Sequence, residues 1–175
     1  MSYKNINTTL KSYFALVFLS AIWGSSFLFI KVSINTIPPS LLTFYRLLIA
    51  SIFLFCFCNK TIVKEILVLN KNLLICIAIF GNVLPFNLIS LSEIHVDSIV
   101  ASTLIGTMPL FTFLISYFFF KSNSLNLLSC LGLLLGFLGM IVFINPSTFS
   151  MKSDTINFSL LIILSSFFYG LSANM

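Results

Sequence analysis

The residue best suited to chemistry in this chain of 175 residues is Arg46, a fixed positive charge within an apolar segment. It lies about two turns, roughly 9 Å at 1.5 Å per residue, inside a helix predicted over 40–58. In a membrane, a charge at such a depth usually marks a solute path or an ion pair. Two interpretations stay open: Arg46 contacts an anionic substrate or a gating carboxylate, or it bonds backbone carbonyls near the membrane surface.

A stripe of small and polar residues runs along the segment 97–120. Its members recur every three or four positions, so a helix would place them on one face. Pro109 would lie near the membrane centre and free the carbonyl of Ile105, which predicts a kink. Kinked helices near the midplane are typical of solute sites, and close helix packing is the alternative. The stripe comprises Ser98, Ser102, Gly106, Pro109, Thr112 and Ser116.

The segment 72–91 repeats this pattern with Gly81, Asn82, Pro85 and Asn87. Pro85 would free the carbonyl of Gly81, and the Asn82 amide would bond either a neighbouring helix or a solute. In 126–145, Gly132, Gly136 and Gly139 have the spacing that allows close helix approach, which favours helix packing or dimerisation. We assign Gly24 the same packing role.

No enzyme motif is found. The chain has one histidine and four acidic residues, so a hydrolytic site would be hard to assemble. Glu93, His95 and Asp97 form a small cluster that would hold a metal or relay protons, or would simply be solvated in a loop. No acidic residue lies near the midplane, which weakens the case for proton antiport.

We interpret the four cysteines as small apolar helix residues; they are Cys56, Cys58, Cys76 and Cys130. We assign no catalytic residue, no metal site and no cofactor.

The elements that must position these residues are transmembrane helices. Hydrophobic residues make up 59% of the chain and charged residues 7%, against roughly 25% charged residues in a soluble domain. About 20 apolar residues cross a bilayer as a helix, which predicts an all-α, polytopic helical membrane protein. The predicted spans are 13–32, 40–58, 72–91, 97–120, 126–145 and 157–175, joined by turns that include the charged segment 59–71.

The lysines set the predicted orientation. With a cytoplasmic N-terminus, the inner segments hold Lys4, Lys11, Lys60, Lys64, Lys71 and Lys121, and the outer loops hold only Lys31 and Lys152. This excess agrees with the positive-inside rule, so the net charge of +5 reflects topology and attraction to lipid headgroups. No basic patch with interleaved aromatic residues indicates nucleic acid as a partner.

Several motifs together resemble a known family. Trp23-Gly24-Ser25-Ser26-Phe27, then Pro38 before Phe44-Tyr45-Arg46, looks like the opening of EamA-type transporters of the drug/metabolite transporter superfamily. The stretch from Ser102 to Pro109-Leu110-Phe111 and the glycines from Gly132 to Gly139 also match. At the start of the fifth span, Ser122 and Asn123 replace a Gly-Glu pair common in the family, which puts a family ion pair there in doubt.

The resemblance implies ten helices in two inverted five-helix repeats, which transport metabolites by alternating access. Tyr169-Gly170-Leu171-Ser172 echoes Trp23-Gly24-Ser25-Ser26, so we interpret 157–175 as the first helix of a truncated second repeat. The other parts are a cytoplasmic tail (1–12), a five-helix repeat (13–145) and an outer loop (146–156).

The expected function is therefore transport of a small organic solute across the plasma membrane by a half-length protein, whose candidate partners are a second copy or a separate second half. The alternative is a non-transporting membrane protein, either a degenerate remnant or an assembly partner. Candidates for the substrate path are Trp23, Ser26, Arg46, Asn82, Pro85, Ser102, Pro109 and Thr112.

Overall fold

The fold consists of helices throughout the part of the chain that the structure describes. This computed structural model describes residues 6–58, 60–120, 127–143 and 153–175. The elements in chain order are α1 (Ile6–Ser33), α2 (Pro39–Phe57), α3 (Lys60–Ala78), the π-helical turn η1 (Ile79–Val83), α4 (Leu84–Ser92), α5 (Ser98–Ile105), α6 (Met108–Phe120), α7 (Leu127–Phe143) and α8 (Ser153–Ala173).

Five of the helical segments are long and apolar enough to cross a membrane. Apolar side chains cover their outer surfaces; Phe14, for example, is 73% exposed. Such a surface suits lipid and would be unusual in water. The predicted class, a polytopic helical membrane protein, is confirmed. The segments are Leu10–Ser33, Pro39–Phe57, Asn70–Ser92, Ser98–Phe119 and Asp154–Ala173, and α7 contains a shorter apolar stretch, Leu131–Met140.

The prediction of a turn over 59–71 was wrong for most of that segment. Residues from Lys60 onward are helical, and the backbone leaves helical geometry only at Asn70 (φ −136°, ψ 34°). Lysine, glutamate and leucine are good helix formers, so charge in this segment marks an amphipathic helix rather than a loop. Asparagine competes with the helix through its own side chain, which fits the position of the break. The helices α1 and α8 likewise begin at Ile6 and Ser153, earlier than predicted.

The third span is distorted just before Pro85. In η1 the backbone N–H of Leu84 donates to the carbonyl of Ile79, five residues back, and α4 continues from there. A wider turn of this kind accommodates one extra residue. It lies where Pro85 cannot donate to the carbonyl of Gly81, as the sequence predicted.

The fourth span is interrupted where the sequence predicted a kink. The helix α5 ends at Ile105 and α6 begins at Met108, with Gly106 and Thr107 between them. The N–H groups of Gly106 and Thr107 donate to carbonyls three residues back, so the chain tightens there. Pro109, which has no N–H to donate, sits in the first turn of α6, where this costs least.

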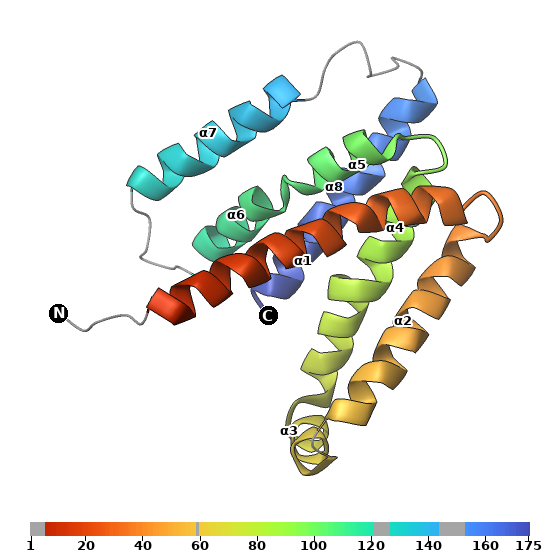
Figure 1. Ribbon diagram of the computed structural model, residues 1–175, viewed down its shortest axis with the longest axis vertical. Helices are drawn as coiled ribbons and strands as arrows, with labels where there is room; N and C mark the ends of the chain where they lie inside the picture. The colour runs from red at the N-terminus through yellow and green to blue at the C-terminus, as the bar shows by residue number, and fades with distance from the viewer. Residues whose placement is uncertain (1–5, 59, 121–126, 144–152) are drawn as a thin grey trace.

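The helix α8 is the centre of the assembly. It packs against α4, α5 and α6, while α2 packs against α4 and α1 against α5. The core between them includes Phe27 of α1, Ile89 of α4, Ala101 of α5 and Ile162 of α8. Figure 1 shows α1 passing in front of α8 and the end of α4, with α2 and α4 side by side.

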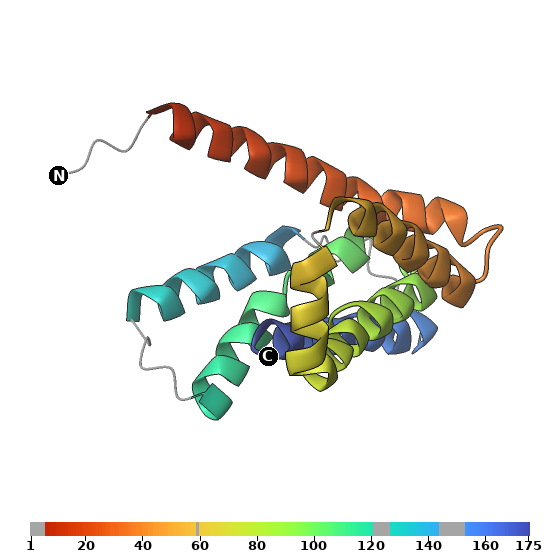
Figure 2. The same cartoon turned by 90° about the horizontal axis from the view of Figure 1, so that it is seen from below.

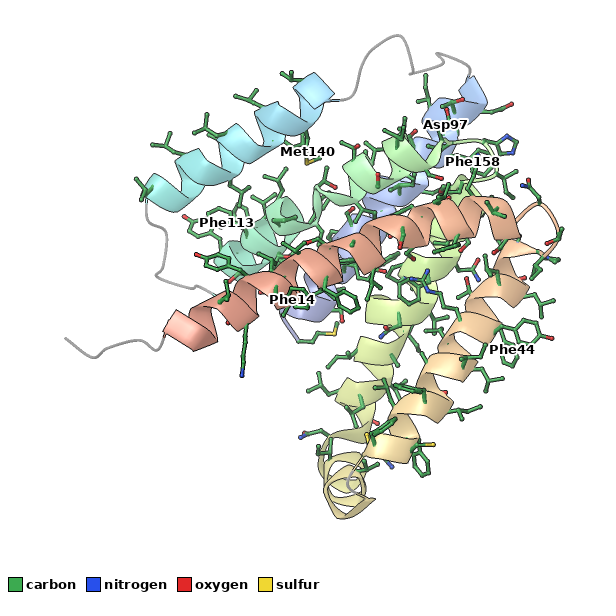
Figure 3. All side chains as sticks on the ribbon, viewed as in Figure 1. Phe14, Phe44, Asp97, Phe113, Met140 and Phe158 are labelled. Atoms are coloured by element: carbon green, nitrogen blue, oxygen red, sulfur yellow. The ribbon has the colours of Figure 1, made fainter. Side chains whose placement is uncertain are left out.

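Two helices are only partly covered by the rest of the described chain. Figure 2 shows the N-terminal half of α1 extending away from the other helices, and Phe14 and Val17 on it are exposed. The helix α7 lies apart as well, although Met140 points from it toward Gly106 (Figure 3).

Candidate functional site

The guanidinium group of Arg46 is held between two helices. Its Nη2 donates a hydrogen bond to Ser26 Oγ of α1 at 2.8 Å. Its carbon lies 4.3 Å from the centre of the Phe86 ring of α4, which is cation–π geometry. Among the described residues these are the only hydrogen bond and the only cation–π contact of the guanidinium, and no carboxylate pairs with it.

Five helices contribute to a small cavity around this group. The volume, about 10 Å³, is near the minimum for one water molecule. Aromatic rings from three helices form much of its wall: Trp23 from α1, Phe86 from α4 and Tyr169 from α8. The remaining lining residues are Ser26, Phe27, Ile30, Arg46, Ile89 and Ile105.

Arg46 and Ser26 also border an open groove. This groove, of about 530 Å³, runs between α1 and α2 and shares Ser26, Ile30 and Arg46 with the small cavity. The Arg46–Ser26 bond therefore lies at the boundary between a space that fits a water molecule and one within the size range of organic ligands. A change in this bond would alter access from one space to the other.

Local structure explains how Arg46 and Phe86 meet. The helix α2 begins with Pro39, whose missing N–H is not needed at a first helical position, and Arg46 follows two turns later. On the other side, the π-helical turn sets the direction of α4, with buried Pro85 directly before Phe86. The two prolines thus help to fix the helix ends that bring the cation and the ring together.

A second groove, between α2 and the third span, holds other candidates. It has a volume of about 490 Å³ and is lined by Asn82, Asn87, Thr43 and Ser51 among mostly apolar residues. Asn82 lies here and not in the cavity around Arg46. The two candidates are therefore on different faces of the α2–α4 pair.

The small and polar residues of the fourth span face mainly other helices and solvent. Ser102 and Thr112 donate to carbonyls of their own helix, those of Ile99 and Met108. Pro109 is exposed. None of the three lines the cavity around Arg46, so their role in a substrate path stays a prediction.

The glycines assigned to packing are open on the side a side chain would occupy. A Cβ atom added at Gly24, Gly132, Gly136 or Gly139 would meet nothing within 4 Å in the described structure. Their packing role therefore stays a prediction that requires a partner beyond these residues.

The cluster at the turn between α4 and α5 is not uniformly solvated. His95 and Asp97 are exposed, with His95 stacked on Phe158 at 4.2 Å between ring centres; Figure 3 shows Asp97 and Phe158 at the same end of the molecule. Glu93, by contrast, is completely buried. The expectation of a solvated loop was wrong for this residue, and Lys31 of α1 and Ser98 of α5 both bond to it.

Glu93 has an unusual electrostatic environment. Burial raises its pKa to about 7, while a hydrogen bond from Ser98 Oγ and the charges of Lys31 and Arg46 act in the opposite direction. Lys31 Nζ donates to the backbone carbonyls of Glu93 and, at 2.9 Å, Val96. The ammonium group thereby holds the turn against the end of α1.

Sequence reasoning missed two residues of this region, Phe86 and Tyr169. It named Glu93 but missed that its side chain is buried. Tyr169 carried a signal, since it occupies the position of Trp23 in the repeated motif, and both rings line one cavity. Cys56, Cys58 and Cys76 are free thiols, and the described residues contain no metal-binding cluster. The side chain of Cys130 lies outside the described residues.

Comparison with known proteins decides the family. A model of the EamA-like transporter family matches residues 10–145. The chain belongs to the EamA-like transporter family. This confirms the resemblance of the Trp-Gly-Ser-Ser and Arg46 motifs. An EamA-like chain is a multi-pass membrane protein of a transporter family, and this points away from an enzyme.

Relatives of this EamA-like chain carry transporter names. An "Uncharacterized transporter in trpA 3'region" of Buchnera aphidicola is 36% identical over 110 residues, covering 61% of this chain and 36% of that protein. The "Uncharacterized transporter YoaV" of Bacillus subtilis is 26% identical over 167 residues, covering 93% and 56%. An "Uncharacterized transporter" of Archaeoglobus fulgidus is 26% identical over 145 residues, covering 79% and 49%. The chain thus spans about half or less of these relatives. No solved structure gives a significant match.

Proposed function

We propose that this EamA-like chain takes part in the transport of a small organic anion or zwitterion, and that Arg46 binds the carboxylate of the solute. The observation that carries the proposal is the unpaired charge of Arg46. A guanidinium has five N–H donors, and in the described structure one of its nitrogens is hydrogen-bonded, to Ser26. The free donors fit a carboxylate in a bidentate arrangement.

The surroundings of Arg46 suit the rest of such a solute. Trp23 and Tyr169 offer aromatic walls to an apolar or aromatic group. The small cavity of about 10 Å³ has no room for an organic molecule, so binding requires the cavity to widen. The adjoining groove of about 530 Å³ supplies the space, and the solute would replace the Ser26 contact.

Transport by alternating access needs a second unit that moves against the first. We propose that a second five-helix repeat, of which α8 is the first helix, completes the transporter. The uncovered half of α1 and the open glycines of α1 and α7 support this. We further propose residence in the plasma membrane with the N-terminus in the cytoplasm, on the distribution of lysines.

The test is uptake into cells or proteoliposomes with a panel of labelled amino acids and small carboxylates. Arg46→Gln should lower uptake of the transported solute about 10- to 150-fold, as expected for the loss of about 1.5–3 kcal/mol from a charged hydrogen bond. Arg46→Lys should retain part of it, and Lys11→Gln is a surface control. If Arg46→Gln and Asn82→Ala both leave uptake unchanged at equal membrane levels, the site assignment is wrong.

The competing function is that of a non-transporting membrane protein. The same exposed glycine faces favour it, because a chain that only assembles with others would present them too. The uptake assay separates the two: a chain that reaches the membrane at normal levels but moves no solute of the panel would favour the rival.

A further inference from the structure

The carboxyl group of Glu93 is buried but is not used by the solute site proposed above. Its exposed fraction is 0%, although it follows the last residue of the span Asn70–Ser92. Ser98 Oγ donates to Oε2 at 3.3 Å, whereas Oε1 is buried without a hydrogen-bond partner in the described structure. A carboxylate oxygen in that state is costly, and protonation of the group removes the cost of its charge.

The charged groups around Glu93 act on it from a distance. Lys31 of α1 and Arg46 of α2 both attract the carboxylate, yet Lys31 bonds backbone carbonyls and Arg46 bonds Ser26. The helix α5 contributes Ser98, and α8 contributes Tyr169, which interacts with Arg46, and the exposed Asp154 in its first turn. On the turn itself, His95 and Asp97 are exposed to solvent. The carboxylate is therefore balanced by cations that are not paired with it.

We propose that Glu93 is a proton-binding site whose protonation is linked to the charge held beside Arg46. While Arg46 is unpaired, its charge favours the carboxylate form of Glu93. When an anion neutralises Arg46, this attraction is lost, and Glu93 takes up a proton from water to become a neutral carboxylic acid. Linkage is reciprocal, so protonation of Glu93 strengthens anion binding by the same factor.

The consequence for transport is that an anionic solute and a proton bind together. This step rests on the proposed function, whereas the link between Glu93 and Arg46 does not need a solute. The carboxyl group lies at the end of a span and not at the midplane, so a search for midplane acids misses it. Affinity for the anion should rise as the pH falls through neutrality.

The first test needs no solute. Infrared titration of the purified chain in lipid should show a protonated-carboxyl band that disappears near neutral pH, is absent in Glu93→Gln and persists in Asp97→Asn. Arg46→Gln and Lys31→Met should each shift the titration of this band to higher pH, because each removes an attractive cation. Two results overturn the inference: titration in the ordinary range of a glutamic acid, or no shift in either variant. Circular dichroism checks that each variant is folded.

The second test uses benzoate as a monoanionic probe and benzamide as its neutral control. Benzoate binding is detected by thermal stabilisation of the protein, and proton uptake is measured with an indicator dye in weak buffer at about pH 7.5. Benzoate binding should be accompanied by proton uptake in the wild type and not in Glu93→Gln. Benzamide should cause no proton uptake. Binding without proton uptake by the wild type overturns the inference and leaves the proposed function standing. Failure of benzoate to bind contradicts the proposed carboxylate site instead, and the infrared titration then decides the inference alone.

Discussion

A methyl group added at Gly170 would lie 2.8 Å from the backbone nitrogen of Thr112 and 2.9 Å from Cβ of Phe111. The helices α8 and α6 are thus in contact along their backbones at this point. Asn174 Nδ2 extends the contact by donating to the carbonyl of Thr112 at 3.1 Å. The corresponding glycine of the repeated motif, Gly24, faces open space, so the two copies of the motif are used differently within this chain.

Gly170→Ala should destabilise the chain by about 1–3 kcal/mol, because the added methyl group meets backbone atoms that cannot move aside. Unfolding in mixed micelles, followed by circular dichroism, measures the effect. The matched control is Gly24→Ala, where the methyl group meets nothing and helix propensity favours alanine by up to about 1 kcal/mol. Equal behaviour of the two variants would contradict the packing described here.

Ser26→Ala should lower stability by about 1–3 kcal/mol, since it leaves a half-buried donor of Arg46 without its hydrogen bond. The neighbouring hydroxyl of Ser25 donates only to the carbonyl of Ile22 in its own helix. Ser25→Ala should therefore have little effect in the same unfolding assay. A loss of equal size in both variants would show that the hydroxyl–guanidinium bond is not the cause.

The stability of the chain should depend on pH through Glu93. Because burial raises its pKa from 4.5 to about 7, the folded chain binds this proton more tightly than the unfolded chain does. The contribution of Glu93 to stability therefore falls as the pH rises from about 4.5 to about 7. Glu93→Gln does not ionise, so its stability relative to the wild type should be higher at pH 8 than at pH 5. Asp97→Asn, at an exposed site, should show no such trend.

The proposed orientation places the α1–α2 turn outside the cell. In a variant without native cysteines, Thr36→Cys should react with a membrane-impermeant maleimide in intact cells, since Thr36 is exposed in that turn. Lys71→Cys, near the opposite end of the third span, should react only after the cells are opened. The reverse pattern would contradict a cytoplasmic N-terminus.

Five of the six predicted spans correspond to long apolar helices among the described residues, because hydropathy is a local signal. The position of Arg46 within one of them is equally visible in the sequence, and its role stays a prediction. The contact with Ser26 was also within reach: Ser26 and Arg46 each lie ten residues from Thr36 in the turn, and a helical hairpin places such residues opposite each other. The burial of Glu93 could not be predicted, since a charged residue by itself indicates a solvated loop. Its burial depends on contacts between the turn and the helices α1 and α5. Phe86 was missed because its direction depends on the wider turn before it.

That wider turn, η1, means that the third span contains one residue more than a regular helix of the same length. A deletion of one residue within 79–83 would restore regular hydrogen bonding and leave the segments on either side in their present relation. The same deletion one turn beyond Phe86 would rotate the C-terminal end of α4 by about 100°, and Glu93 would leave its buried position. This span should therefore tolerate a shortened sequence at η1 and nowhere else between Asn82 and Glu93.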